Sequence, residues 1–346
     1  MSTDANRAGR LRELDALRGF GAILVVGFHY TTRFRELFPN APHVPFNVGG
    51  GDYRVLLFFA ISGFAIFFSL RRLTAGWDFV AGRAARLLPA YWAAMMLTLL
   101  IEHLGHMTML YIPPFAALMN VTMLQGFFFL PAVDGAYWTL TVEVAFYLCV
   151  LILWQLCRMR HVERLLLCWL IIKLIFELVW PDMPERIVML LILRHMPYFA
   201  IGMASYRVWA GERSWQQQAP FLAAIVTTIA VSDTIDFLVV GLLIIAIFVA
   251  VVEGRMRWIC ITPLVWVGQI SYSLYLVHQH IGFTIMLNAE AAGLGPIGAF
   301  ILAVVAAFAL GYTINRCVER PAIDHIMRRW QRFRARPRGR PEPEPG

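Results

Sequence analysis

Apolar residues occur along this chain in long runs, separated by short stretches rich in charge, glycine or proline. An α-helix needs roughly 20 apolar residues to cross a bilayer, and most of these runs are near that length. The pattern predicts an all-α integral membrane protein with about ten transmembrane helices. They are expected at residues 14–34, 53–70, 84–104, 138–157, 164–181, 187–209, 218–233, 237–252, 263–287 and 296–317.

A further apolar stretch, residues 111–131, differs from these runs. Pro113, Pro114 and Pro131 bracket it, and it lacks a flanking charge. Irregular backbone is tolerated at membrane depth where protein surrounds it. We interpret the stretch as a short re-entrant or interfacial segment rather than a full span.

Composition agrees with this interpretation. Of the 346 residues, 59% are hydrophobic and only 15% are charged, and the mean hydropathy is +0.64, whereas soluble domains carry roughly 25% charged residues. This balance excludes a soluble enzyme, a disordered chain and a sizeable domain outside the membrane.

The positive charges predict the orientation. With ten spans, 24 of the 30 Lys and Arg residues fall on one side and five on the other, and Lys173 lies within a span. Because cytoplasmic loops are enriched in Lys and Arg, both termini are expected in the cytoplasm. If residues 111–131 formed an eleventh span, the charge bias after Tyr111 would be reversed, which argues against eleven spans. In a membrane protein, the net charge of +8 indicates contact with anionic lipid rather than with nucleic acid.

The two ends of the chain are expected to differ in structure. No small-residue cleavage site follows the first run, so we do not expect a cleaved signal peptide. Residues 1–326 are predicted to form one membrane domain, and residues 327–346 a basic, disordered cytoplasmic tail, because seven Arg lie between Arg328 and Arg340. The five Cys have no metal-like spacing, so neither a disulfide framework nor a bound metal is expected.

Ionisable side chains within apolar runs are candidates for a site, because placing them in a bilayer is costly. Arg18 and His29 are eleven residues apart, which on a helix is about 20° more than three full turns. They therefore share one face of the helix and lie about 16 Å apart along its axis. Asp15 can pair with Arg18. His29 is a candidate general base. The alternative for His29 is a structural histidine bonded to a carbonyl. The alternative for Asp15 and Arg18 is an ion pair at the membrane interface.

Two further charged motifs stand out. Arg83 and Arg86, one turn apart, could bind phosphates, since guanidinium groups make bidentate contacts, or could simply set the topology. Glu143 lies five residues into a run and shares a polar stripe with Thr139 and Tyr147; it could be catalytic or pair with a structural arginine.

A second polar stripe lies in the run at 263–287. It consists of Ser271, Tyr275 and His278, and hydrogen bonding between helices is the favoured interpretation of it.

Six motifs in this order resemble the acyltransferase type 3 family, integral membrane enzymes that acylate bacterial surface sugars and some other acceptors. The motifs are LDALRGFGAILVVGFH at 14–29, FFAISGF at 58–64, RAARLLP at 83–89, YWTLTVEVAFY at 137–147, ISYSLYLVH at 270–278 and VERPA at 318–322.

The resemblance implies a multi-pass protein of the bacterial inner membrane. The implied donor is acetyl-CoA or another acyl-CoA from the cytoplasm, and the implied acceptor is a hydroxyl of a lipid-linked or exported saccharide, such as an exopolysaccharide or O-antigen. Arg18 and His29 match the family's Arg-x10-His signature, Arg83 and Arg86 its arginine-rich motif, and Glu143 its buried carboxylate. Val144 stands where many members have a second carboxylate.

From these motifs we expect His29 to act as the base that Glu143 supports, with Arg83, Arg86 and Arg18 binding the phosphates of CoA. No fused hydrolase-like domain follows the motifs, so a second transfer step outside the membrane would need a separate protein. Two alternatives from other classes are a transporter or flippase of a lipid-linked saccharide and a structural subunit of an export complex.

Overall fold

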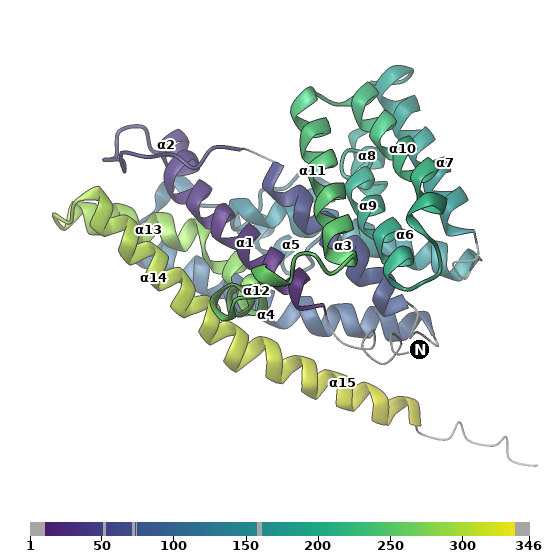
Figure 1. Ribbon diagram of the computed structural model, residues 1–346. Helices are drawn as coiled ribbons and strands as arrows, with labels where there is room; N and C mark the ends of the chain where they lie inside the picture. The colour runs from purple at the N-terminus through teal and green to yellow at the C-terminus, as the bar shows by residue number, and fades with distance from the viewer. Residues whose placement is uncertain (1–10, 51–52, 71–72, 74, 158–160, 336–346) are drawn as a thin grey trace, which may run out of the picture.

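The computed structural model describes residues 11–50, 53–70, 73, 75–157 and 161–335, and these form helices joined by short connections (Figure 1). No β-strand occurs within these ranges, which confirms the all-α fold class. The longer helices are α1 (Arg12–Phe28), α3 (Tyr53–Leu70), α4 (Gly76–Leu104), α6 (Trp138–Cys157), α7 (Val162–Leu178), α9 (Met196–Trp209), α10 (Trp215–Ser232), α11 (Ile235–Val252), α12 (Thr262–Val277), α13 (Gln279–Ala291), α14 (Pro296–Ile314) and α15 (Arg320–Ala335).

Short helical segments link these elements. They are α2 (Phe34–Leu37), α5 (Pro114–Asn120), α8 (Glu185–Leu190), 3-10 turns at Thr108–Leu110, Gln125–Phe128, Gly135–Tyr137 and Arg257–Ile259, and π-helical turns at His29–Arg33 and Asn315–Glu319. Helices α7 to α11 gather at one end of the molecule, and α2, α13 and α14 at the other (Figure 1).

Five stretches of the described chain are long and apolar enough to cross a membrane. They are Tyr53–Leu70, Gly76–Leu104, Gly135–Gln155, Ile235–Val252 and Pro296–Ala335. The protein is therefore a multi-pass membrane protein by helix length and composition. Ten spans and cytoplasmic termini remain predictions.

Two of the predicted spans are interrupted, whereas the runs at 14–34 and 296–317 continue through π-helical turns. The run at 187–209 divides into α8 and α9, with Ile192 between them at a φ of 46°. Pro197 lies in the first turn of α9, where a proline is tolerated because the N–H that it lacks would have no helical partner. The run at 263–287 divides into α12 and α13 at His278. Hydrophobicity did not mark either break as the end of a span, because each apolar run resumes after only two or three polar residues, Arg194 and His195 in the first and residues 278–280 in the second.

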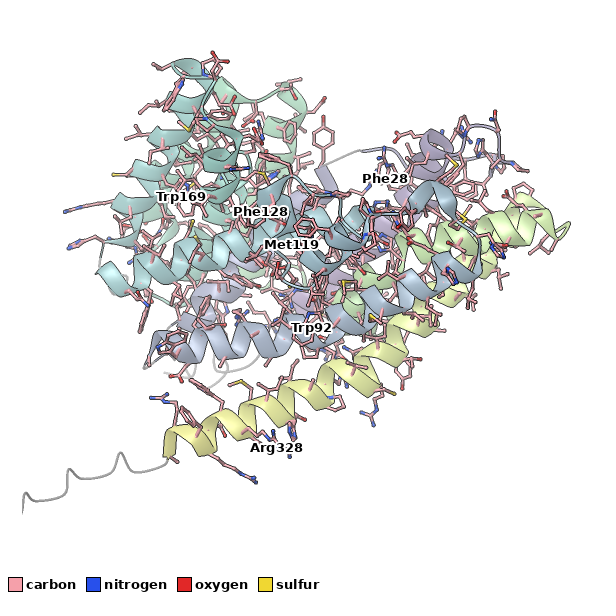
Figure 2. The ribbon with its side chains drawn as sticks, turned by 180° about the vertical axis from the view of Figure 1, so that it is seen from behind. Phe28, Trp92, Met119, Phe128, Trp169 and Arg328 are labelled. Carbon is pink, nitrogen blue, oxygen red and sulfur yellow. The ribbon has the colours of Figure 1, made fainter. Side chains whose placement is uncertain are left out.

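The segment at 111–131 contains no helix longer than the seven residues of α5, so it is not a full span. Its backbone is organised by the buried Asn120, whose amide donates to the carbonyls of Ala116 (2.8 Å) and Pro131 (2.9 Å). Trp92 of α4 donates to the carbonyl of Val121 at 2.9 Å. Figure 2 labels Trp92, and Met119 and Phe128 within the segment.

Close backbone contacts hold α1 against α12 and α3 against α9. A Cβ atom at Gly268 would lie 1.8 Å from the carbonyl oxygen of Asp15, and one at Gly202 would lie 1.8 Å from that of Ala60. Small residues permit such approaches in membrane helix pairs. These contacts fix α1, which carries Arg18 and leads into the turn that begins at His29, against α12.

The C-terminal tail predicted to be disordered from residue 327 is helical as far as Ala335, which corrects that expectation. Helix α15 follows α14 through a π-helical turn and extends beside α4 (Figure 1). Trp330 Nε1 donates to Asp78 Oδ1 at 2.8 Å, and Arg334 also donates to Asp78. These bonds to α4 hold the helix in place. Residues 336–346 of the predicted tail lie outside the described residues.

Candidate functional site

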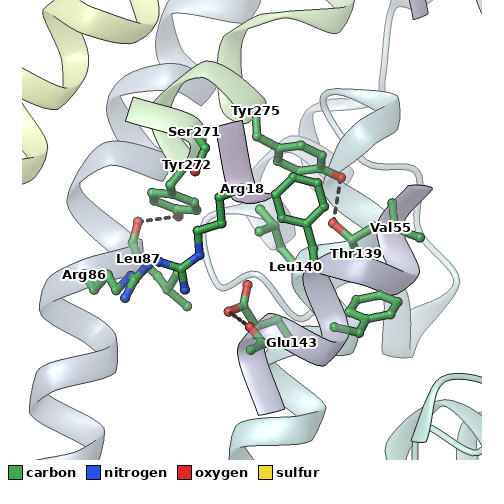
Figure 3. A pocket seen from close by; sticks show the side chains of 13 residues that line it. Arg18, Val55, Arg86, Leu87, Thr139, Leu140, Glu143, Ser271, Tyr272 and Tyr275 are labelled. Carbon is green, nitrogen blue, oxygen red and sulfur yellow. Dashed lines mark hydrogen bonds between the residues drawn. The ribbon is translucent and has the colours of Figure 1, made fainter. Parts of the chain in front are cut away.

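A pocket of about 100 Å³ lies between α1, α3, α4, α6 and α12 (Figure 3). Its charged lining residues are Arg18, Arg86 and Glu143, which come from three different helices. The rest of the lining is Val55, Phe58, Phe59, Ser62, Leu87, Thr139, Leu140, Ser271, Tyr272 and Tyr275. The structure thus brings together three of the five residues proposed from sequence.

The two arginines and the carboxylate face one another across this pocket. Figure 3 shows the side chains of Arg18, Arg86 and Glu143 around this one pocket. Arg18 is also 3.9 Å from the carboxylate of Asp15, the pair expected from their i, i+3 spacing. Such a site can hold an anionic group, because two guanidinium groups supply forked N–H donors.

Neighbouring hydroxyl groups fix the Glu143 carboxylate. Ser62 Oγ donates to Glu143 Oε1 at 3.2 Å, and the Tyr147 hydroxyl donates to the same oxygen. Thr139, one turn before Glu143, is 2.6 Å from the hydroxyl of Tyr275. The polar stripe predicted on this helix therefore joins α6 to α3 and α12.

Arg83 has different surroundings from Arg86. It donates to Ser69 Oγ at 2.9 Å, and its guanidinium carbon lies 5.5 Å from the ring centroids of both Phe79 and Tyr147. It lies outside the lining of the pocket and reaches Glu143 only through Tyr147. The two arginines of one motif therefore do not present a single surface.

His29 also lies outside the lining of this pocket. It begins the π-helical turn that follows α1, and such turns occur frequently at functional sites. Its Nδ1 is 2.9 Å from the carbonyl oxygen of Val25 and 3.1 Å from Nε2 of His278. The ring centroid of His278 is 5.5 Å from that of Tyr275, a pocket residue. His29 is thus linked to the pocket through two aromatic side chains, and its hydrogen bonds are not to Glu143.

A second buried polar cluster lies beside His278 and was not identified from the sequence. Nδ1 of His280 is 2.6 Å from the carboxylate of Glu102, and the backbone N–H of His280 donates to Asp134 at 2.9 Å. Glu102 lies in a predicted span, and that position was the one signal for it in the sequence. The described residues contain no group of three or more metal-ligating side chains.

The fold and this site define a class: a helical multi-pass membrane protein with a pocket between its helices that is lined by two guanidinium groups and a carboxylate. Residues 11–316, nearly the whole chain, match the family described as an acyltransferase domain. The chain belongs to this family, which its sequence motifs resemble, and it is an acyltransferase. No curated protein and no solved structure matches the chain significantly.

Proposed function

We propose that this enzyme transfers an acyl group from cytoplasmic acyl-CoA to a hydroxyl of a lipid-linked or exported saccharide. The observation that carries the proposal is the pocket in which Arg18 and Arg86 face Glu143, in a chain that belongs to an acyltransferase family. The guanidinium groups suit the anionic donor. The pocket, at about 100 Å³, is too small for a whole nucleotide and suits the acyl end of the donor, since sites for whole ligands enclose roughly 300–1,000 Å³.

In this proposal, Arg86 and Arg18 bind the donor and His29 performs the proton transfer. His29 takes the proton of the acceptor hydroxyl as that oxygen attacks the thioester carbonyl. The carbon–sulfur bond then breaks, and His29 returns the proton to the departing thiolate. The products are an O-acyl ester and free CoA.

We assign Glu143 a role different from the one expected from sequence. Its hydrogen bonds to Ser62 and Tyr147 hold it opposite the arginines rather than against His29. The carboxylate therefore orients the guanidinium groups and balances part of their charge when no donor is bound, because unpaired charges are costly in a low-dielectric interior.

The test measures thiol release from acetyl-CoA by purified protein mixed with a crude surface-glycan fraction, followed by mass analysis of the glycan. Wild-type protein is expected to release thiol and to add one acyl mass. Because general-base catalysis contributes roughly 10²–10⁴-fold, His29→Ala should lose that much activity. His161→Ala, which changes an exposed histidine at the start of α7, is the control.

Two outcomes would contradict the proposal. Full activity of His29→Ala would exclude the histidine as base. Absence of thiol release, together with movement of lipid-linked saccharide across vesicles, would favour a transporter. Deletion of the gene should also remove one acyl mass from cell-surface or secreted glycans, which identifies the acceptor. Label from acyl-CoA that stays on denatured protein would indicate a covalent acyl-histidine in place of direct transfer.

A further inference from the structure

The break between α12 and α13 is built from side chains that bind the backbone on both sides of His278. Nδ1 of His278 lies 2.7 Å from the carbonyl oxygen of Tyr275, and the hydroxyl of Tyr137 donates to the carbonyl of Leu276 at 2.9 Å. On the other side of the break, Asp134 accepts the N–H of His280. Backbone groups that lose their helical hydrogen bonds inside a membrane protein require such partners.

The His278 side chain is held in one place by this arrangement. The residue is fully buried, and its own carbonyl accepts a hydrogen bond from the hydroxyl of Tyr30 at 2.5 Å. Tyr30 follows His29 in the π-helical turn. Two independent contacts therefore join the His29 turn to the break: the Tyr30 hydroxyl to the His278 carbonyl, and the His29 ring to the His278 ring.

The two carbonyl oxygens determine which ring nitrogens carry protons. A carbonyl only accepts, so the Nδ1 atom beside it must be the donor in a neutral imidazole. His278 therefore carries its proton on Nδ1, facing Tyr275, and its Nε2 is a bare acceptor. His29 likewise carries its proton on Nδ1, which faces both the carbonyl of Val25 and Nε2 of His278.

We propose that His278 is a positioning residue that holds His29 as the Nδ1–H tautomer, so that Nε2 of His29 is the nitrogen that takes the acceptor's proton. This inference rests on the proposed role of His29 as base. His278 has the part that a carboxylate has in a serine protease triad, where the third residue fixes the tautomer and orientation of the histidine.

The proton balance of the step is complete within this pair. Nε2 of His29 receives the hydroxyl proton while the new carbon–oxygen bond forms, and it gives the proton to the thiolate when the carbon–sulfur bond breaks. Throughout, Nδ1–H of His29 keeps its bonds to Val25 and His278, which strengthen when the ring becomes cationic. A neutral partner does this without placing a further charge in the apolar interior.

The first test observes the tautomer directly and needs no activity. In wild-type protein labelled with 15N-histidine, nuclear magnetic resonance should show His29 protonated at Nδ1 and bare at Nε2, with His29→Asn used to assign its signals among the nine histidines. A His29 signal protonated at Nε2 would overturn the inference, whether or not the protein is an acyltransferase of saccharides.

The second test compares two variants of similar volume. His278→Leu removes the acceptor, while His278→Gln keeps an oxygen that can accept from Nδ1 of His29. Because a misplaced catalytic group can cost about 10²-fold, His278→Leu should lower kcat by about that factor, with KM for acetyl-CoA unchanged. His278→Gln should recover most of the loss.

These results separate the inference from the proposed function. Equal kcat in His278→Leu and wild type, or equal loss in both variants with a raised KM for acetyl-CoA, would overturn the positioning role. If His278→Leu does not fold, the kcat of His278→Gln and the tautomer of His29 in the wild-type protein still test the positioning role of His278. Full activity of His29→Ala would instead overturn the proposed base, even with the tautomer as expected.

Discussion

Arg83 and Arg86 show how neighbours in one motif acquire different surroundings. Their three-residue spacing suggests a joint phosphate site, but Arg86 lines the pocket while Arg83 packs against Phe79 and Tyr147 and donates to Ser69. The sequence selected both residues as candidates for phosphate binding. The sequence could not show which way each side chain points, because this depends on which helices pack against α4.

This difference predicts unequal effects on donor binding. Arg86→Ala removes a pocket guanidinium, and a hydrogen bond to a charged group contributes about 1.5–3 kcal/mol, so KM for acetyl-CoA should rise by roughly 10- to 100-fold. Arg83→Ala should raise it less and should lower the melting temperature. Arg255→Ala, at an exposed loop arginine paired with Glu253, is the control. Equal rises in KM for both variants would show that the donor contacts Arg83 as well.

At the scale of helices, the close packing of α1 against α12 determines where the site residues lie. The amphipathic pattern of either helix contributes less. Gly19 and Gly268 lie where the two backbones meet; a Cβ at Gly19 would be 2.1 Å from the carbonyl oxygen of Leu264. This contact aligns the ends of the helices, so that His29 and His278 meet although 249 residues separate them along the chain.

Gly268→Ala is therefore expected to be strongly destabilising. The added methyl group would overlap the Asp15 carbonyl, and overpacking costs about 1–3 kcal/mol or more, so the variant should melt earlier and lose activity. Gly82→Ala is the matched control, because a Cβ there meets nothing within 4 Å and alanine favours helix over glycine by about 1 kcal/mol. Thermal unfolding in detergent measures both. A Gly268→Ala protein as stable as wild type would mean that α1 and α12 lie farther apart.

At the scale of the whole molecule, the distribution of arginine predicts orientation. The ten-span prediction puts the loop at residues 38–50 on the side with few positive charges, and the turn before α10 on the side with many. The proposed reaction requires this asymmetry, because the donor comes from the cytoplasm while the acceptor is lipid-linked or exported.

Cysteine labelling tests the orientation. In a cysteine-free background, Asn40→Cys should react with an impermeant maleimide in intact spheroplasts, and Gln216→Cys only after the membrane is permeabilised, because both residues are exposed but are predicted on opposite sides. Labelling of both residues from outside would contradict cytoplasmic termini.

The sequence by itself determined that the chain is helical and where most helices lie, and the five residues that it proposed for a site include the three charged residues that line the pocket. Run length and charge placement are local properties, so Arg18, Arg86 and Glu143 could be selected without a structure. Helical order at the start of the predicted tail was missed, because it depends on bonds from Trp330 and Arg334 to Asp78.

Only the tertiary structure decided how the histidines meet and where α12 ends. His278 belonged to a stripe that favoured ordinary hydrogen bonding between helices, and the three polar residues at 278–280 do not by themselves end a helix. The break exists because Tyr137, Asp134 and the ring of His278 bind the backbone there. These partners come from distant parts of the chain, and hydrogen bonds between distant segments form only when packing brings the segments together.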